Sequence, residues 1–304
     1  MDQIAVLSHI VLDEVHPADS DSHTEVGGAG AYAAVGASLA GRAGSAVLVS
    51  GVGSADRAAF VRWCSERGID SAGLFDVGEH GPRTVIRYSA DGERVETPVH
   101  GPAHFHAHTP LPRHLPASVR SLAGVYLFHD HDPEYWDEIA ASRAQWSGPV
   151  LWEIAADACR TDALPAVLER LASVDVLSIN RTEVLSLFGA AGIGAAVAEL
   201  SRLDVTTVLR LGAGGSLVVE GGGRAAVTAV GIDRGAVVDP TGGGNSYSGA
   251  FLASFAASGD PVAAARLATA VAAAVIAQPG APLVDDPLRE RVRRRASLIP
   301  LGTP

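Results

Sequence analysis

The segment VVDPTGGGNSYSGAFLASFAASGDP, residues 237–261, combines the pattern of a strand end, a run of glycines and the pattern of a helix. Its two valines predict the end of a strand, and its small and apolar residues predict a helix over residues 246–258. Between them, Gly242, Gly243 and Gly244 let the backbone approach a ligand and point successive N–H groups at it. The helix that follows adds the positive end of its dipole. We therefore predict a site for phosphate or a developing negative charge; a flexible turn is the alternative.

The basic residues of the chain narrow the chemistry of such a site. There are 23 arginines and no lysine. This excludes a Walker-type phosphate loop, Schiff-base catalysis by lysine and the strand lysine of protein kinases. Phosphate chemistry must therefore use arginine, backbone amides, helix dipoles or metal. Asp239 and Thr241, which flank the glycines, can coordinate cations beside an anion.

Along the rest of the chain, short apolar runs rich in β-branched residues alternate with alanine-rich stretches of helical pattern. Gly68 predicts a helix end, and Asp260 with Pro261 predicts a helix start. This alternation is typical of a parallel sheet covered by helices on both faces. No repeat or linker divides the chain, so we expect one unit over residues 1–304. The predicted strands are 4–7, 46–50, 125–128, 150–152, 174–179 and 206–211, and the helices 28–40, 55–67 and 261–278.

One segment departs from this alternation. Residues 83–89 and 93–99 alternate in character on either side of Ala90-Asp91-Gly92, which predicts a β-hairpin. We expect it to protrude and to form a small separate sheet with residues 10–16 and 23–26, as a lid over a cleft. The alternative is an ordinary excursion at the sheet edge. If the exposed lid face is apolar, we expect two copies to form a homodimer through it.

Composition limits the partners. With 47% hydrophobic residues and a net charge of −11, the chain can bury a sizeable core and is a poor partner for nucleic acid or an anionic membrane. No run reaches about 18 apolar residues, so no transmembrane span is expected. Cys64 and Cys159 lack metal-ligand spacing, and two cysteines in a long chain favour a reducing, cytoplasmic location. The N-terminal stretch is predicted as a strand rather than a signal peptide.

Residues 239–245, followed by SYSGAFLASFAASGD, resemble the second signature of the ribokinase-like, or PfkB-type, carbohydrate kinase family. The resemblance extends along nearly the whole chain in the expected order. Asp13 follows the first strand, and Asn180 with Glu183 matches the N-x-x-E motif of the family. The other matching segments are 27–41 (GGAGAYAAVGASLAG), 175–189, 208–219 (VLRLGAGGSLVV) and 265–281.

This resemblance implies a three-layer α/β/α fold with a mostly parallel sheet and a small β lid. It implies transfer of the γ-phosphoryl group of ATP to a hydroxyl, usually of a sugar or nucleoside, with Mg²⁺. On the substrate side, it implies that Asp13, Gly27 and Gly28 contact substrate hydroxyls. Tyr32 could stack on a sugar or base face, or it could pack as an ordinary helix aromatic.

On the nucleotide side, the resemblance implies that Asn180 and Glu183 arrange water and magnesium around the phosphates. Gly242, Gly243 and Gly244 would cradle the transferring group, and a monovalent cation would lie near the carboxylate that precedes them. The remaining candidates are Arg210, Gly212, Gly215 and Thr241 for the nucleotide, and Glu183 and Asp239 for metal.

The sequence departs from the family at the catalytic position. The last aspartate of the signature, the proton acceptor of the family, is here Asn245. A neutral amide cannot accept the proton, and loss of a general base costs about 10²–10⁴-fold in rate. Three interpretations stay open: a slow kinase, a kinase with another base, or a protein that binds a nucleotide or metabolite without turnover. His129, Asp130 and His131 are candidate bases; the alternative is that they are polar loop residues after a strand.

Three further features lack an assigned role. Arg210 stands where the family commonly has threonine, and it could reach a phosphate or be a surface cation. His104, His106 and His108 would share one face of a strand and could then hold zinc or copper, but the nearby prolines favour a polar loop. The arginines of residues 289–295 are expected on the solvated face of a last helix.

Overall fold

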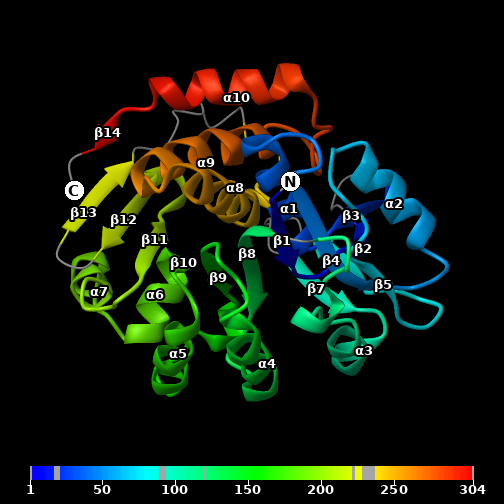
Figure 1. Cartoon of the computed structure of the whole chain (residues 1–304), viewed down its shortest axis with the longest axis horizontal. Helices are drawn as coiled ribbons and strands as arrows, with labels where there is room; N and C mark the ends of the chain where they lie inside the picture. The colour runs from blue at the N-terminus through cyan, green and yellow to red at the C-terminus, as the bar shows by residue number, and fades with distance from the viewer. Residues whose placement is uncertain are drawn as a thin grey trace.

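A ten-stranded sheet forms the centre of the molecule in a computed structural model that describes residues 2–16, 21–88, 94–119, 121–220, 223–227 and 237–302 (Figure 1). Neighbouring strands run parallel through most of the sheet, and an antiparallel extension completes one edge. The parallel strands, in spatial order, are β11 (Thr206–Arg210), β10 (Val176–Asn180), β9 (Val150–Ile154), β8 (Leu122–His129), β1 (Gln3–Leu7), β4 (Ala46–Val52) and β5 (Leu74–Asp76). The extension is β12 (Ser216–Glu220), β13 (Gly223–Val227) and β14 (Leu301–Gly302).

Helices cover both faces of this sheet, each over its own hydrophobic cluster (Figure 1). One layer contains α1 (Ala29–Ala40), α2 (Arg57–Ser65), α8 (Gly243–Ser258), α9 (Pro261–Val275) and α10 (Asp286–Leu298). The other contains α4 (Pro133–Arg143), α5 (Leu164–Arg170), α6 (Arg181–Phe188) and α7 (Ile193–Leu200). Because side chains alternate along a strand, Tyr126 packs toward α8, whereas Val125 and Leu127 pack toward α4. This confirms the predicted α/β class.

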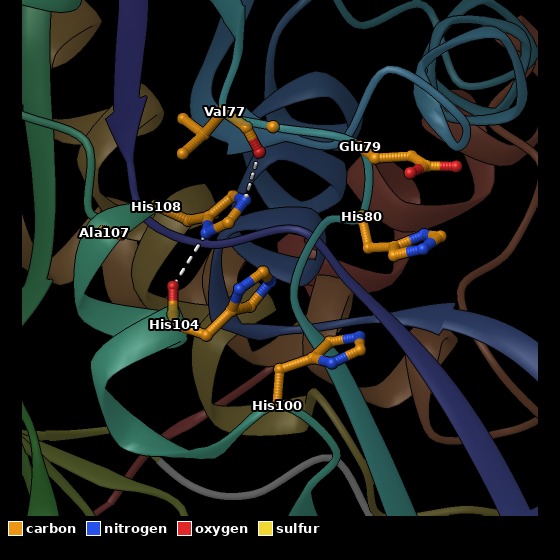
Figure 2. A pocket seen from close by; sticks show the side chains of 8 residues that line it. Val77, Glu79, His80, His100, His104, Ala107 and His108 are labelled. Carbon is orange, nitrogen blue, oxygen red and sulfur yellow. Dashed lines mark hydrogen bonds between the residues drawn. The ribbon is translucent and has the colours of Figure 1, made fainter.

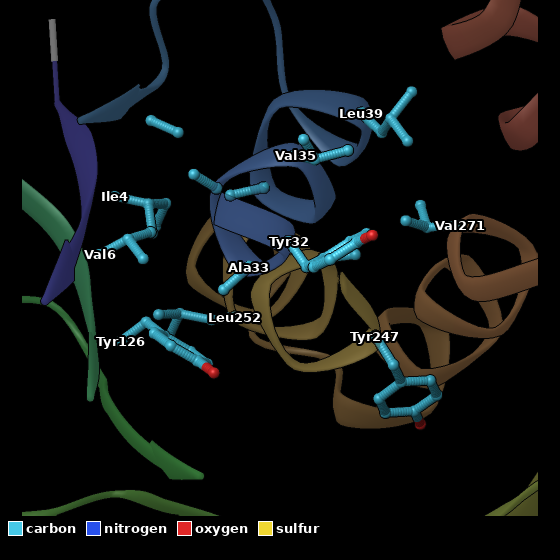
Figure 3. Packing of buried hydrophobic residues seen from close by; sticks show 14 of the residues in the cluster. Ile4, Val6, Tyr32, Ala33, Val35, Leu39, Tyr126, Tyr247, Leu252 and Val271 are labelled. Atoms are coloured by element: carbon cyan, nitrogen blue, oxygen red, sulfur yellow. The ribbon is translucent and has the colours of Figure 1, made fainter. Parts of the chain in front are cut away.

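Close contact between α1 and α8 fixes the start of α8 (Figure 3). A Cβ atom on Gly36 would lie 2.0 Å from the carbonyl oxygen of Ser246, and one on Gly249 would lie 2.0 Å from that of Ala33. A larger residue at either glycine would force the two helices apart. Small residues at this crossing therefore hold the first turns of α8 against α1.

The predicted hairpin lies in a second, four-stranded sheet of order β3-β2-β6-β7, which acts as a lid. Its strands are β2 (Val11–His16), β3 (His23–Gly27), β6 (Arg83–Tyr88) and β7 (Arg94–Pro98). The turn at Ala90-Asp91-Gly92 lies outside the described residues. Val95 is 63% exposed, and pairing of two copies through this sheet stays a prediction that light scattering can check.

Several element boundaries differ from those predicted. Helix α8 begins at Gly243 rather than at residue 246, and α9 ends at Val275 rather than at residue 278. Residues 237 and 238 are not in a strand: the N–H groups of Val238 and Asp239 both donate to the carbonyl of Ile276. Short 3₁₀ turns at Pro112–His114, Ala156–Ala158, Leu171–Ser173 and Gly212–Gly214 connect the main elements.

Two expectations about polar segments were wrong. The histidines of residues 104–108 lie in and just after a helix, α3 (Gly101–Ala107), rather than in a loop or strand. In α10 most arginines are exposed, but Arg289 is buried, because its guanidinium donates to the carbonyl and hydroxyl of Ser38. No single helix among the described residues has the length and apolar character to cross a membrane, whereas α6 and α7 together, bent by 74°, meet that test of length and composition alone.

Candidate functional site

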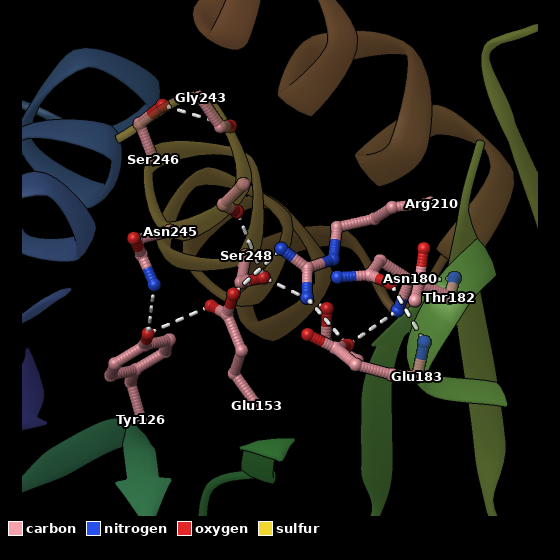
Figure 4. A network of polar contacts seen from close by, with 12 residues as sticks. Tyr126, Glu153, Asn180, Thr182, Glu183, Arg210, Gly243, Asn245, Ser246 and Ser248 are labelled. Atoms are coloured by element: carbon pink, nitrogen blue, oxygen red, sulfur yellow. Dashed lines mark hydrogen bonds and ion pairs between the residues drawn. The ribbon is translucent and has the colours of Figure 1, made fainter. Parts of the chain in front are cut away.

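Polar side chains from four neighbouring parallel strands meet the first turn of α8 (Figure 4). Asn180 and Arg210 are the last residues of β10 and β11, and Glu153 is the last but one of β9. Tyr126 reaches the same place from β8. The carboxyl ends of strands in an open α/β sheet are where ligands bind. The cluster therefore lies where the fold favours a functional site.

The predicted anion cradle is the first turn of α8. Gly242 precedes the helix with φ 73°, a backbone conformation that favours glycine. A Cβ atom there would also lie 2.0 Å from the ring of Tyr32. Tyr32 itself is 2% exposed, and this burial favours packing inside the helix layer over stacking on a ligand.

Asn180 and Glu183 form a local capping box at the start of α6. The Asn180 Oδ1 atom accepts the N–H groups of Thr182 and Glu183, and the N–H of Asn180 donates to Glu183 Oε2 at 2.7 Å. Burial raises the pKa of the Glu183 carboxyl, and nearby Arg210 opposes this rise. The motif thus presents one partly desolvated carboxylate beside the cluster.

Arg210 is buried between two carboxylates, so its interpretation as a surface cation was wrong. Its Nη1 atom lies 2.6 Å from Glu153 Oε1, and Nη2 lies 3.6 Å from Glu183 Oε2. Burial alone would lower the pKa of Arg210, but the two carboxylates outweigh it and leave the pKa raised. The guanidinium is therefore firmly charged.

Tyr126 and Glu153 were missed as site residues. The Tyr126 hydroxyl donates to Glu153 Oε2 at 2.8 Å, and the Asn245 amide donates to the Tyr126 oxygen at 3.5 Å (Figure 4). Burial and Glu153 raise the pKa of Tyr126 well above its ordinary value. A carboxylate near the end of an apolar strand was the available signal for Glu153. We call Tyr126, Glu153, Glu183 and Arg210 the arginine network.

On the lid side, the structure brings Asp13, Gly27 and Gly28 together. Asp13 is 7% exposed, and a Cβ atom on Gly27 would lie 2.0 Å from its Oδ2 atom. Gly28 has φ 92°, and a Cβ atom there would lie 2.6 Å from the carbonyl of His9. The glycines thus let the chain pass close to the Asp13 carboxylate, where a substrate hydroxyl was expected to bind.

Asp239 organises the loop before α8. Its Oδ1 atom accepts the N–H of Thr241 at 2.9 Å, and Oδ2 accepts the N–H of Gly280 at 3.4 Å. Burial raises the pKa of Glu25 on β3, and nearby Asp239 adds to the rise. Across the part of the chain that the structure describes, no group of three or more His, Cys, Asp or Glu could hold a metal ion. Magnesium and monovalent cation binding stay predictions.

The nucleotide candidates after β11 form a tight turn. Gly212 and Gly215 have φ 58° and 84°, and the N–H of Leu211 donates to the carbonyl of Gly215. Nothing lies within 4 Å of a Cβ atom built on Gly212. This turn leaves open space next to Arg210.

The alternative base His129, with Asp130 beside it, lies on the α4 side of β8. His129 is the last residue of β8, and its ring stacks on Tyr135 of α4 at 3.8 Å. Its Nδ1 atom lies 2.8 Å from Asp130, whose pKa it lowers to about 2. The alternation that turns Tyr126 toward Asn245 turns His129 away from it. Among described residues, the side-chain hydrogen bond of Asn245 goes to Tyr126 rather than to this segment.

A cavity separate from this site is lined by histidines (Figure 2). The His80 and His100 rings are stacked, with 9° between their planes, so their nitrogens do not converge on a common point. Both ring nitrogens of His108 face carbonyl oxygens, those of His104 and Val77. These contacts give no support for zinc or copper. We call His80, His100, His104 and His108 the histidine cluster.

The fold defines a ribokinase-like α/β protein, with three glycines at the start of a helix beside the carboxyl ends of its strands. Residues 1–286 match the pfkB family carbohydrate kinases, and the chain belongs to this family. None of the curated proteins matches the sequence.

Solved structures of the same fold are similar over nearly the whole chain. The adenosine kinase from Sinorhizobium meliloti has a TM-score of 0.78 at 19% identity, covering 96% of this chain and 99% of that one. The Arabidopsis thaliana ribokinase complexed with ribose and ATP has a TM-score of 0.75 at 18% identity, covering 98% and 100%. The Burkholderia thailandensis nucleoside kinase in complex with inosine has a TM-score of 0.72 at 16% identity, covering 97% of each chain.

Proposed function

We propose that the chain is an ATP-dependent phosphotransferase that acts on a hydroxyl of a sugar, a nucleoside or a related small molecule. The observation that carries this proposal is the first turn of α8, where Gly244 lies against the charged Arg210 guanidinium at the carboxyl ends of the strands. Family membership over residues 1–286 supports it. So do the ligands named for similar structures: ribose with ATP, ADP, and inosine.

The proposed roles follow the geometry of the site. Asp13 on the lid side would bind an acceptor hydroxyl. Gly212 and Gly215 would border the nucleotide, and the α8 turn would receive its phosphates through backbone N–H groups. Glu183 has the oxygen donors that magnesium prefers. Bound magnesium would neutralise phosphate charge; the chain itself orients the two substrates and closes the lid over them.

Asn245 favours a second candidate, a kinase-fold protein that binds a nucleotide or metabolite without turnover. An assay of ADP formation from ATP and Mg²⁺ with ribose, fructose, adenosine and inosine separates the two. The kinase proposal expects ADP formation that depends on one acceptor and a phosphorylated product visible by mass spectrometry. Calorimetric binding of ATP with no product from any acceptor would favour the second candidate.

Replacement of Gly243 by valine tests the cradle within this proposal. The bulky side chain would obstruct phosphate approach, so ATP affinity measured by calorimetry is expected to fall. Unchanged ATP affinity in a folded Gly243→Val protein would show that the cradle is misassigned.

A further inference from the structure

Arg210 reaches from the end of β11 to the first turn of α8 (Figure 4). A Cβ atom on Gly244 would lie 2.2 Å from its Nη1 atom, so the guanidinium rests directly against the backbone of that turn. The chain has no lysine. Arg210 is thus a fixed positive charge at the point where, under the proposed function, phosphate arrives.

Glu153 determines where this charge lies. Its side chain is 3% exposed, and its Oε1 atom lies 2.6 Å from Arg210 Nη1. Its second oxygen accepts the Tyr126 hydroxyl. Both carboxylate oxygens are therefore engaged, and the pair cannot rotate without losing a buried contact.

The Nη2 and Nε atoms of the Arg210 guanidinium have weaker contacts than Nη1. The contact of Nη2 with Glu183 is long, at 3.6 Å. Within the described residues, the buried Nε atom has no hydrogen-bond partner. Donors on the side away from Glu153 therefore remain for a ligand oxygen, which would release Glu183 from the guanidinium.

We propose that Arg210 contacts the transferring phosphoryl group in the transition state and that Glu153 is the positioning residue that holds it there. This inference rests on the proposed function. In the step, the acceptor oxygen bonds to the γ-phosphorus while the bond from that phosphorus to the bridging oxygen breaks. ADP leaves with the electron pair, and the hydroxyl proton is released to solvent. Arg210 makes and breaks no covalent bond; it stabilises charge on the phosphoryl oxygens.

The arrangement also gives a physical reason for Asn245. The network already holds two carboxylates, Glu153 and Glu183, around one guanidinium. An aspartate at position 245 would face Tyr126 and add a third negative charge beside it. A neutral amide avoids this repulsion and leaves the charge of Arg210 less screened.

The first test compares Arg210→Lys with the control Arg202→Lys, since Arg202 is an exposed arginine paired with Glu199. Lysine keeps the charge but loses the planar fork that spans Glu153 and a phosphate. We expect Arg210→Lys to lower kcat about 10²–10³-fold with little change in the KM for ATP, and the control to leave both unchanged. Unchanged or increased kcat in Arg210→Lys would overturn the inference.

The second test measures binding rather than turnover. Aluminium fluoride with ADP and Mg²⁺ mimics the transferring phosphoryl group, so the wild type is expected to bind this mixture more tightly than ADP alone. Arg210→Lys should lose that difference and keep its affinity for ADP. Equal gains in both proteins would contradict the role of Arg210, whereas a wild type that binds no ADP would contradict the proposed function itself.

The role of Glu153 is tested by comparing two conservative variants, Glu153→Gln and Glu153→Asp. Glu153→Gln should lower kcat, because the guanidinium then turns toward Glu183, and Glu153→Asp should restore part of the loss. Far-UV circular dichroism checks that each variant is folded. If Glu153→Gln keeps the wild-type kcat, or if both variants lose ATP binding and kcat alike, Glu153 is not a positioning residue.

Discussion

The arginine network and the histidine cluster both crowd ionisable groups together, but they control charge differently. In the network, Arg210 is buried, and two carboxylates raise its pKa. In the cluster, the rings stack on one another, and the pKa of His100 is lowered by desolvation and then by His104 and His80. Opposite charges thus keep Arg210 ionised, whereas desolvation, with the neighbouring imidazole rings, favours the neutral form of His100. Stability should therefore depend on each charged partner in the network and on pH near the cluster.

The largest expected effect comes from removing the central cation. Arg210→Ala leaves Glu153 and Glu183 buried without a counter-charge, which should lower the free energy of unfolding by about 3–5 kcal/mol. His100→Ala in the cluster should leave the free energy of unfolding almost unchanged, since the His100 side chain is exposed. Urea unfolding at pH 7 measures both, and equal losses would remove the contrast between the regions.

The second comparison uses one glycine near each region, Gly242 before α8 and Gly101 at the start of α3. Gly242 and Gly101 both have positive φ, 73° and 77°, but a Cβ atom on Gly242 would strike the Tyr32 ring, whereas nothing lies within 4 Å of one on Gly101. We expect Gly242→Ala to cost about 2–4 kcal/mol, from strain and overpacking together, and Gly101→Ala about 1–2 kcal/mol from strain alone. Thermal unfolding of the two variants checks this order.

The third prediction is acid sensitivity beside the histidine cluster, at His9, which is not itself a member of the cluster. Burial lowers the pKa of His9, which contacts Phe105 of α3, from 6.5 to about 4. Below about pH 6.5, His9 binds a proton in the unfolded chain, whereas in the folded chain it does so only near pH 4. Stability should therefore be complete above pH 6.5, fall as the pH falls, and level off near pH 4, with a loss of about 1–3 kcal/mol because the side chain is partly exposed.

His9→Gln separates this proton from the others. Urea midpoints recorded between pH 4 and pH 8 should show a smaller acid loss in His9→Gln than in the wild type. Identical pH profiles would mean that another group takes up the proton.

Among the substitutions in and next to the arginine network, the smallest effect on stability is expected from Asn245→Asp. The new carboxylate supplies a proton acceptor, so kcat should rise, but by less than the about 10²–10⁴-fold of an unhindered general base. Repulsion from Glu153 raises its pKa and should lower stability by about 1 kcal/mol. If Asn245→Asp lowers stability by the same amount in the wild type and in Glu153→Gln, the two side chains do not interact.

The order of strands and helices was predictable because apolar periodicity and turn residues are local signals. The lid was predictable because two alternating segments flank an Asp-Gly turn. The start of α8 was placed too late, because Gly243 and Gly244 lower helix propensity while the packing of α8 on α1 and α9 overrides it. The histidines of α3 were misassigned because nearby prolines obscured a helix of seven residues.

In the site, the three glycines at the start of α8 were a local signal in the sequence, and the Asn180–Glu183 pair came from the resemblance to the family motif. The arginine network was not, since Tyr126, Glu153 and Arg210 lie on three strands, and their contact depends on strand order and register. Alternation along β8 distinguishes Tyr126 from His129, but only once the position of α8 is known. Arg210 and Glu183 were identified singly, but their contact and the partner Glu153 were not.

The ring of Tyr32 has a consequence for the range of acceptors. It comes from the first turn of α1, which follows the substrate-side glycines, and lies against Gly242, which begins the cradle. Together with the Gly36–Ser246 contact, it fixes the distance between the starts of α1 and α8 at the thickness of one aromatic ring. This distance cannot increase to fit a larger acceptor without loosening the core. Under the proposed function, we therefore expect acceptor preference to change during evolution through substitutions in the lid strands, while the distance between the two helix starts stays constant.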